Sequence, residues 1–146
     1  MSSIFTKIVK GEIPCFKITE DDNYLAFLDA FPLTLGHVLV IPKKETDYLF
    51  DLESEEYFGL WKFSQKIAKA MDKVIKCERI GVAVIGLEVP HAHIHLVPIN
   101  NVEEVVVYGE TLRWDADDPM LDILNVLTAG EPLWKLDTLY KDVWER

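Results

Sequence analysis

Three of the four histidines of this chain fall within five residues, at His91, His93 and His95. On a β-strand alternate side chains share a face, so all three imidazoles would project together, with neighbours about 6.5–7 Å apart. The residues between them would face the core. Each imidazole could accept or donate a proton near pH 7, because its ordinary pKa is about 6.5. The spacing therefore predicts a row of groups suited to acid–base or nucleophilic chemistry.

Two other interpretations of this row stay open from the residues alone. It could be a row of surface histidines, although the strict spacing makes that the weaker interpretation. It could also hold zinc, since three histidines would supply three protein ligands. Chemistry at a phosphorus atom needs a neutral nucleophile and a nearby proton donor for the leaving group. A row of imidazoles supplies both without a metal ion.

The row must be positioned by the elements around it, which hydropathy periodicity predicts. Its own strand is expected over residues 91–97, closed by Pro98. The other strands are expected over residues 15–19, 24–28, 37–41, 80–85 and 102–108, and the helices over residues 4–10, 51–76, 119–128 and 132–144. The β-branched strand at 80–85 is expected to be buried.

The long helix at 51–76 has the clearest pattern. Ser54 is expected to cap it, with Glu55 and Glu56 beside the positive end of the helix dipole. Its apolar stripe is expected to consist of Phe58, Trp61, Ile67, Met71, Val74 and Ile75.

The chain has 146 residues and a formal net charge of −10. Residues 1–100 hold 14 acidic and 11 basic side chains, a net of −3, whereas residues 101–146 hold 11 acidic and 4 basic, a net of −7. The sequence therefore predicts a near-neutral domain over 1–100 and an acidic extension over 101–146, packed on the same domain and containing Trp114, Trp134 and Trp144.

Charge and composition also exclude some classes of partner. A chain this acidic repels nucleic-acid polymers and anionic membranes. No apolar run reaches the length of a membrane span, and the first residues lack the pattern of a signal peptide. Cys15 and Cys77 are expected to be reduced thiols. A cytoplasmic location is therefore predicted.

Four blocks of the sequence occur in an order shared with one known family. They are an apolar block with a Gly-Glu-Ile-Pro end at 4–14, Ala-Phe-Leu-Asp before a proline at 26–32, Gly-His-Val-Leu-Val-Ile-Pro at 36–42, and the histidine row with its flanks at 89–98. Together they resemble the histidine-triad (HIT) family over residues 1 to about 100.

The resemblance implies an α+β fold. This is a HIT-like antiparallel sheet of about five strands with one long helix and a short N-terminal helix, here with a C-terminal strand and helix extension. It implies a homodimer without a cofactor that hydrolyses or transfers at the α-phosphate of a purine nucleotide, an AMP or GMP derivative. A purine nucleoside phosphoramidase is the first expectation. A dinucleoside polyphosphate hydrolase and a catalytically weakened nucleotide-binding module are the alternatives.

The resemblance also implies roles for single residues. His93 matches the nucleophile, which would form a covalent nucleotidyl-imidazole that water then hydrolyses. His95 and His37 match positions around the phosphate, and His91 matches the histidine that supports the array. Asp29 matches an acidic residue that binds the ribose hydroxyls. The apolar positions of the base pocket are matched by Ile4, Phe5, Ile8 and Phe27.

Two features depart from the family pattern. The loop before the histidines is short, and Leu87 and Glu88 stand where relatives carry Gln and then Ser or Thr. A carboxylate at Glu88 beside a phosphate would repel it by about 1 kcal/mol at 4 Å in water, so the substrate or its affinity would change. Some relatives also hold structural zinc through an N-terminal Cys-x-x-Cys. Ser3 and Thr6 occupy those places, so no metal is expected.

Overall fold

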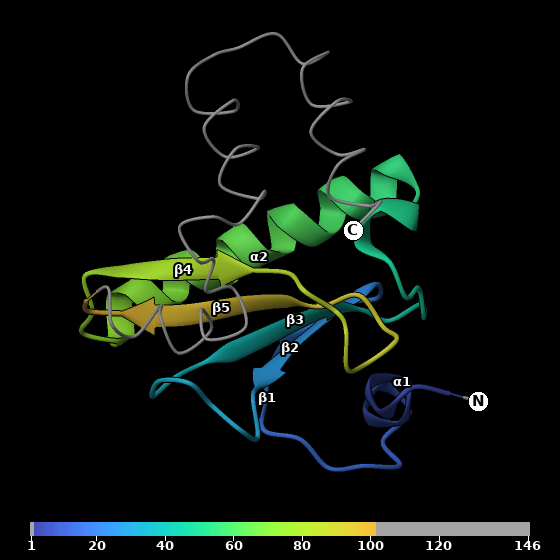
Figure 1. Ribbon diagram of the computed structural model, residues 1–146, viewed down its shortest axis with the longest axis horizontal. Helices are drawn as coiled ribbons and strands as arrows, with labels where there is room; N and C mark the ends of the chain where they lie inside the picture. The colour runs from blue at the N-terminus through green and yellow to red at the C-terminus, as the bar shows by residue number, and fades with distance from the viewer. Residues whose placement is uncertain (1, 102–146) are drawn as a thin grey trace, which may run out of the picture. The chain divides into compact units, whose positions relative to one another are not determined.

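The computed structural model describes residues 2–101 of the chain (Figure 1). Spatial contacts group the chain into one unit over Met1–Val107 and another over Tyr108–Arg146. The predicted domain boundary at residue 100 stays a prediction. The strand expected at 102–108, the two C-terminal helices and the three tryptophans of the extension lie outside the described residues.

Five strands form one open antiparallel sheet with the order β1-β2-β3-β5-β4. The strands are β1 (Lys17–Glu20), β2 (Tyr24–Leu28), β3 (Val38–Pro42), β4 (Arg79–Ala83) and β5 (Ile94–Ile99). The helices are α1 (Ile4–Val9) and α2 (Ser54–Val74), with a 3-10 turn at Leu49–Asp51. The predicted α+β class, the five-stranded sheet and both of these helices are confirmed.

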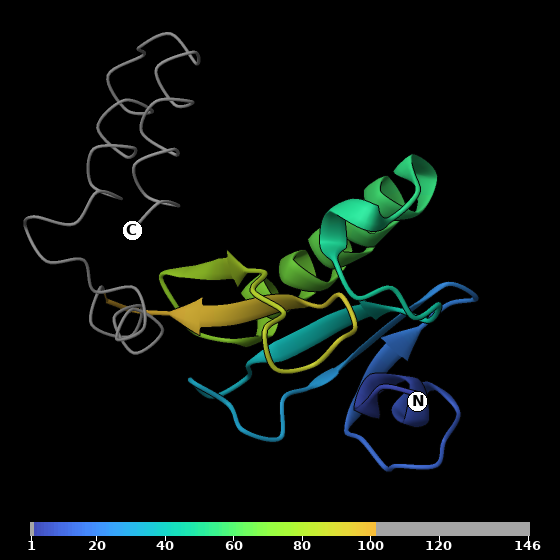
Figure 2. The same cartoon turned by 45° about the vertical axis from the view of Figure 1, so that its right-hand side comes forward.

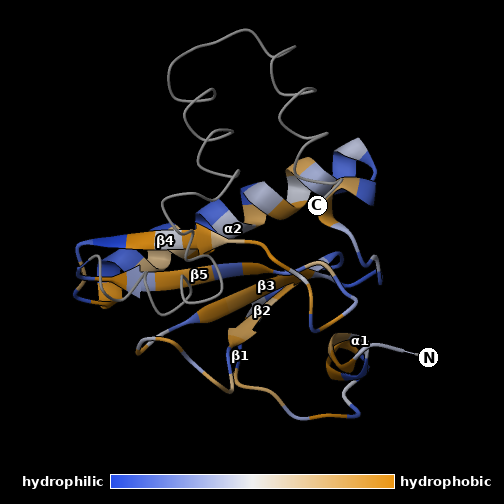
Figure 3. Ribbon diagram, viewed as in Figure 1, coloured by the Kyte–Doolittle hydropathy of each residue, from blue (hydrophilic) through white to orange (hydrophobic). Residues whose placement is uncertain are grey.

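Helix α2 covers one face of the sheet, as Figures 1 and 2 show. Alternate residues of the central strands point toward it, which is the period of two that a half-covered strand requires. The shared core contains Val38, Val40, Ile94 and Leu96 from the sheet and Leu60, Phe63, Ile67 and Met71 from the helix. Figure 3 shows the corresponding apolar colouring along β3 and β5 and the mixed polar and apolar turns of α2.

Three details of the predicted long helix are wrong. Glu53, not Ser54, occupies the N-cap, and its side chain makes no capping hydrogen bond. Phe58 is 69% exposed and Val74 is 82% exposed, so neither belongs to the buried stripe. The buried stripe runs through Leu60 and Phe63 instead, because the face that contacts β2 and β3 is rotated from the one that the pattern suggested.

Helix α1 lies on the opposite side of the sheet from α2 (Figure 2). Its Phe5 packs with Leu25, Phe27, Leu39 and Ile41, which are the alternate residues of β2 and β3. The sheet therefore has two apolar faces, one covered by α2 and the other partly covered by the N-terminal helix.

Strand β4 is an edge strand and not the buried strand that its β-branched residues suggested. It pairs only with β5 within the described part of the chain, and Val82 is 52% exposed. β-Branched residues favour strands in general and do not by themselves report burial. No helix within residues 2–101 is long and apolar enough to cross a membrane.

Candidate active site

The histidines gather on the sheet face that carries α1. The antiparallel register pairs Leu39 of β3 with His95 of β5, so these two residues share a face. His37 lies two residues before Leu39, so its side chain is on the same face of the sheet. The centroids of the His37 and His95 rings are therefore only 5.1 Å apart. Their proximity is a consequence of strand register.

The prediction that all three triad histidines sit on one strand is wrong, since β5 begins only at Ile94. His91 and His93 belong to the segment before it. The amide of His91 donates to Val89 O at 2.8 Å, and the amide of Ala92 donates to Thr46 O at 2.6 Å. These bonds take the place of a sheet ladder. The His93 and His95 rings still meet, with centroids 4.9 Å apart.

The hydrogen bonds of His93 define its tautomer. Its Nδ1 lies 2.7 Å from the backbone oxygen of His91. A carbonyl oxygen only accepts, so Nδ1 must carry the proton of the neutral ring. Nε2 then holds the lone pair. This arrangement is the one that a nitrogen nucleophile requires, and the His93 residue is 7% exposed.

A second chain of hydrogen bonds assigns the protons of His37 and His95. The amide of Leu33 donates to His37 Nδ1 at 3.1 Å, so the proton of the neutral His37 ring sits on Nε2. His37 Nε2 lies 2.9 Å from His95 Nδ1 and 3.5 Å from a carboxylate oxygen of Asp29. His37 therefore donates to His95, and the proton of His95 sits on Nε2.

Burial keeps these rings neutral. Loss of hydration, together with the nearby His93 and His37, lowers the pKa of His95 to about 4. Burial also lowers the pKa of His37, against the opposing effect of Asp29. The pKa of His91 is lowered by burial too, although the bond to Pro42 acts in the other direction. Neutral imidazoles at pH 7 are what the tautomer assignment requires.

The side chains of Asp29, His37 and His95 bring ligand-type atoms within 4.8 Å of one another, which would suit a metal ion. The surroundings of His37 do not fit this use. A metal-bound histidine donates its second ring N–H to an acceptor. Here a backbone N–H donates to Nδ1 of His37, so Nε2 must hold the proton and cannot coordinate without losing it. Hydrogen bonding, not metal coordination, explains this cluster.

Comparison with known protein families decides the relationship. The model of the HIT domain matches residues 10–102, which include all five strands, α2 and the four histidines. The chain belongs to the HIT family. The resemblance drawn from the four sequence blocks is thereby confirmed.

Curated relatives of this HIT protein include two named enzymes. It is 37% identical over 116 residues to the adenosine 5'-monophosphoramidase of Schizosaccharomyces pombe, covering 78% of this chain and 84% of that one. It is 35% identical over 126 residues to the adenosine 5'-monophosphoramidase of Saccharomyces cerevisiae, covering 85% of this chain and 77% of that one.

Solved structures agree on the fold. A HIT family protein from Bacillus anthracis superposes with a TM-score of 0.68 at 30% identity, over 86% of this chain and 92% of that one. A zinc-bound histidine triad family protein from Mycobacterium smegmatis gives a TM-score of 0.66 at 35% identity, over 81% and 86%.

The other predicted site residues of this HIT protein lie at different depths. Phe5 and Phe27 are buried, at 7% and 3% exposure, whereas Ile4 is half exposed and Ile8 is partly buried. Phe5 meets the His93 ring edge-on at a centroid distance of 5.0 Å. Phe5 thus connects helix α1 with the histidines. The base-pocket roles of Ile4, Phe5, Ile8 and Phe27 stay predictions.

Asp29 and Glu88 differ in their surroundings. Asp29 is partly buried, accepts the amide of Phe31 at 2.9 Å and faces His37. Glu88 is exposed on the short loop before the histidines. The structure therefore connects Asp29 with the histidine cluster and gives Glu88 no comparable contact among the described residues. Both ligand-binding roles stay predictions.

Two residues that contact His91, and a third that binds both of them, were not predicted as part of the site. Ser3 and Thr6 reach His91 from α1, and Glu45 holds both of them. Ser3 lies 88 positions from His91, so no local pattern in the sequence could relate them.

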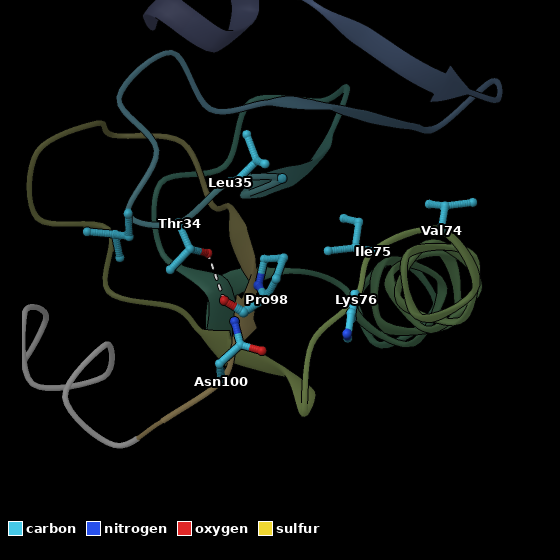
Figure 4. Close-up of a pocket in the computed structure, with 9 residues that line it drawn as sticks. Thr34, Leu35, Val74, Ile75, Lys76, Pro98 and Asn100 are labelled. Carbon is cyan, nitrogen blue, oxygen red and sulfur yellow. Dashed lines mark hydrogen bonds between the residues drawn. The ribbon is translucent and has the colours of Figure 1, made fainter.

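A separate hollow of about 630 Å³ opens beside the loop that precedes β3 (Figure 4). Its walls come from residues 33–36, the C-terminal end of α2 and the end of β5. The hydroxyl of Thr34 donates to Pro98 O at 2.7 Å along one wall. None of the four histidines lines it, so it is not the site of the histidine chemistry.

Proposed function

We propose that this HIT protein hydrolyses the P–N bond of a purine nucleoside phosphoramidate, an AMP or GMP derivative, through a covalent nucleotidyl-His93. The observation that carries the proposal is the bond from His93 Nδ1 to His91 O. It places the lone pair of a neutral imidazole on Nε2. The two relatives named as adenosine 5'-monophosphoramidases support the same substrate class.

The reaction would take two steps. His93 Nε2 attacks phosphorus, the substrate P–N bond breaks, and the amine takes a proton from solvent as it leaves, a proton that the water of the second step later returns. Water then attacks the same phosphorus and releases a nucleoside monophosphate and neutral His93. Over both steps one water is consumed, its hydroxyl going to phosphorus and its remaining hydrogen to the amine.

The neighbours of His93 would orient the phosphate. The Nε2–H of His95, assigned through its bond from His37, is a donor for a phosphoryl oxygen. Preorganised donors of this kind stabilise charge that develops in a transition state. Asp29 would bind the ribose hydroxyls, and Ile4, Phe5, Ile8 and Phe27 would line the base pocket. No cofactor or metal ion is needed for these steps.

Brief exposure of the protein to an adenosine phosphoramidate, followed by intact-protein and peptide mass spectrometry, tests this proposal. We expect an adenylyl adduct on His93 and turnover to AMP. His93→Ala should remove both and reduce turnover by at least about 10³-fold, since the covalent route is lost. Equal turnover by the two proteins, or an adduct on another residue, would refute the mechanism.

Glu88 favours a second candidate, a nucleotide-binding module with weak turnover. Its exposed carboxylate lies on the loop directly before His91, where an approaching polyphosphate would be repelled. Under this candidate, AMP binds and neither a phosphoramidate nor a dinucleoside polyphosphate is cleaved. Parallel assays of both substrates separate the phosphoramidase, the polyphosphate hydrolase and the binding module.

The remaining properties are inferred from the resemblance and the composition. We infer a homodimer, which sedimentation equilibrium would show as twice the chain mass. We also infer a cytoplasmic location, for which fractionation of the source cells is the measurement.

A further inference from the structure

The side chains of Ser3, Thr6 and Glu45 tie the N-terminal segment to His91, and we call these four residues the N-terminal clamp. The hydroxyl of Thr6 donates to Glu45 Oε1 at 2.9 Å, and the amide of Ser3 also donates to that oxygen. Ser3 Oγ lies 2.8 Å from His91 Nδ1. Three segments that are distant in the sequence therefore meet at one buried imidazole.

The protons of the clamp can be assigned without conflict. His91 Nε2 lies 2.7 Å from Pro42 O and must donate to it, so Nδ1 is an acceptor. Ser3 Oγ accepts the amide of Thr6 at 3.0 Å, and its single proton goes to Nδ1 at 2.8 Å in preference to Thr6 Oγ1, which lies farther away at 3.2 Å. The hydroxyl proton of Thr6 is used by Glu45.

The clamp leads directly to the proposed nucleophile. Both ring nitrogens of His91 are held, one by Ser3 and the other by Pro42 O, which restrains the His91 residue as a whole. The backbone oxygen of that same residue accepts the Nδ1 proton of His93. Phe5 lies between Ser3 and Thr6 in the chain, and its ring contacts both His91 and His93.

Glu45 is suited to anchor this arrangement. It is exposed, so it requires no costly desolvation, yet its bonds to Ser3 and Thr6 lower its pKa to about 2. The carboxylate therefore stays ionised at neutral and mildly acidic pH. Charge-assisted hydrogen bonds of this type are stronger than neutral ones.

We propose that Glu45 and Ser3 are positioning residues that fix the tautomer and orientation of His93 through His91. They touch no reacting atom. The effect on rate rests on the proposed function, whereas the effect on the His93 tautomer does not. Loss of the clamp would let the His91 carbonyl shift, and His93 would then populate both neutral tautomers.

Long-range ¹H–¹⁵N NMR spectra of the full chain report which ring nitrogen of each histidine carries the proton. We expect wild-type His93 to be protonated on Nδ1 and His91 on Nε2. Glu45→Ala and Ser3→Ala should move His93 toward a mixture of tautomers. Glu45→Gln keeps an accepting oxygen and should retain the wild-type pattern. Asp47→Asn, at an exposed carboxylate two residues away, is the matched control.

Turnover of an adenosine phosphoramidate gives the second readout. We expect Glu45→Ala and Ser3→Ala to reduce kcat about tenfold or more, since small displacements of a reacting group slow the reaction strongly. The kcat of Glu45→Gln and of Asp47→Asn should stay near the wild-type value. Folded Glu45→Ala and Ser3→Ala proteins with unchanged His93 nitrogen shifts would overturn the proposal. So would altered shifts with undiminished kcat. If wild type turns over no substrate, the proposed function fails and the NMR result alone decides the clamp.

Discussion

Individual imidazoles in this protein differ in proton placement although their side chains are identical. His93 carries its proton on Nδ1 because a carbonyl oxygen faces that atom, whereas His37 carries it on Nε2 because a backbone N–H faces Nδ1. The partner of each ring, rather than the histidine itself, therefore decides whether it can act as a nucleophile or a donor.

Acid should destabilise the protein through His95. An unfolded histidine has a pKa of about 6.5, whereas burial holds the folded His95 near 4. Between these values the unfolded chain binds a proton that the folded chain does not, so stability falls as pH decreases. We expect the free energy of unfolding to be level above about pH 7 and to drop toward pH 4, with at most about 3 kcal/mol from this residue.

Urea denaturation at several pH values from 7.5 down to about 4.5 measures this slope. The pKa of Glu45 lies near 2 in the folded chain, so its own loss of stability falls mostly below this window. His95→Gln keeps a polar side chain without the titration and should flatten the curve. An equally steep curve in His95→Gln would contradict the assignment.

At the scale of elements, hydrophobic periodicity located the strands and helices but not their ends. The alternation of residues 91–97 looks like one strand, yet β5 starts at Ile94. The segment before it is held by bonds to Thr46 and by the His91 contacts. A strand requires a partner at each position, and partner positions depend on the neighbouring strand, which periodicity does not encode.

Close packing between α2 and β2 makes Gly59 essential for stability. A Cβ at this position would overlap Oη of Tyr24 and lie 2.8 Å from its Cζ. That hydroxyl is fixed by donation to Glu56 O at 3.1 Å. We expect Gly59→Ala to lower the free energy of unfolding by about 1–3 kcal/mol, even though alanine favours a helix by about 1 kcal/mol.

Thermal and urea denaturation test this expectation, with Gln65→Ala on the exposed part of α2 as the control. Adding Tyr24→Phe removes the atom nearest to the new methyl group. Adding Gly59→Ala to the Tyr24→Phe protein should therefore lower the free energy of unfolding by less than adding Gly59→Ala to the wild-type protein does. A stabilising Gly59→Ala would show that α2 does not approach β2 this closely.

At the scale of the whole molecule, the two faces of the sheet carry different groups of residues. One face packs against α2 and provides the larger core, while the other carries the histidines and is partly covered by α1. The long helix can therefore contribute most of the burial without contacting the site. The net charge of −10 belongs to the full chain, and the residues up to 100 carry only −3 of it.

This charge distribution predicts selectivity for a single nucleotide over a polymer. A polynucleotide binds largely through many phosphate contacts with basic side chains, which an acidic chain cannot provide. We expect no binding of a fluorescein-labelled single-stranded oligonucleotide by fluorescence anisotropy at low salt. AMP should, under the same conditions, perturb the NMR signals of His93. Tight, salt-sensitive binding of the oligonucleotide would refute this prediction.

The sequence by itself determined the family, the α+β class and the four histidines, because these follow from residue types at short, regular spacings. Only the tertiary structure decided which histidines share protons, since His37 meets His95 through strand register. It also brought Ser3 to His91 across 88 positions of chain, and Glu45 to Ser3 across 42. Local patterns fix what a segment can form. The hydrogen bonds that define a tautomer depend on atoms brought together by folding, and no spacing along the chain specifies them.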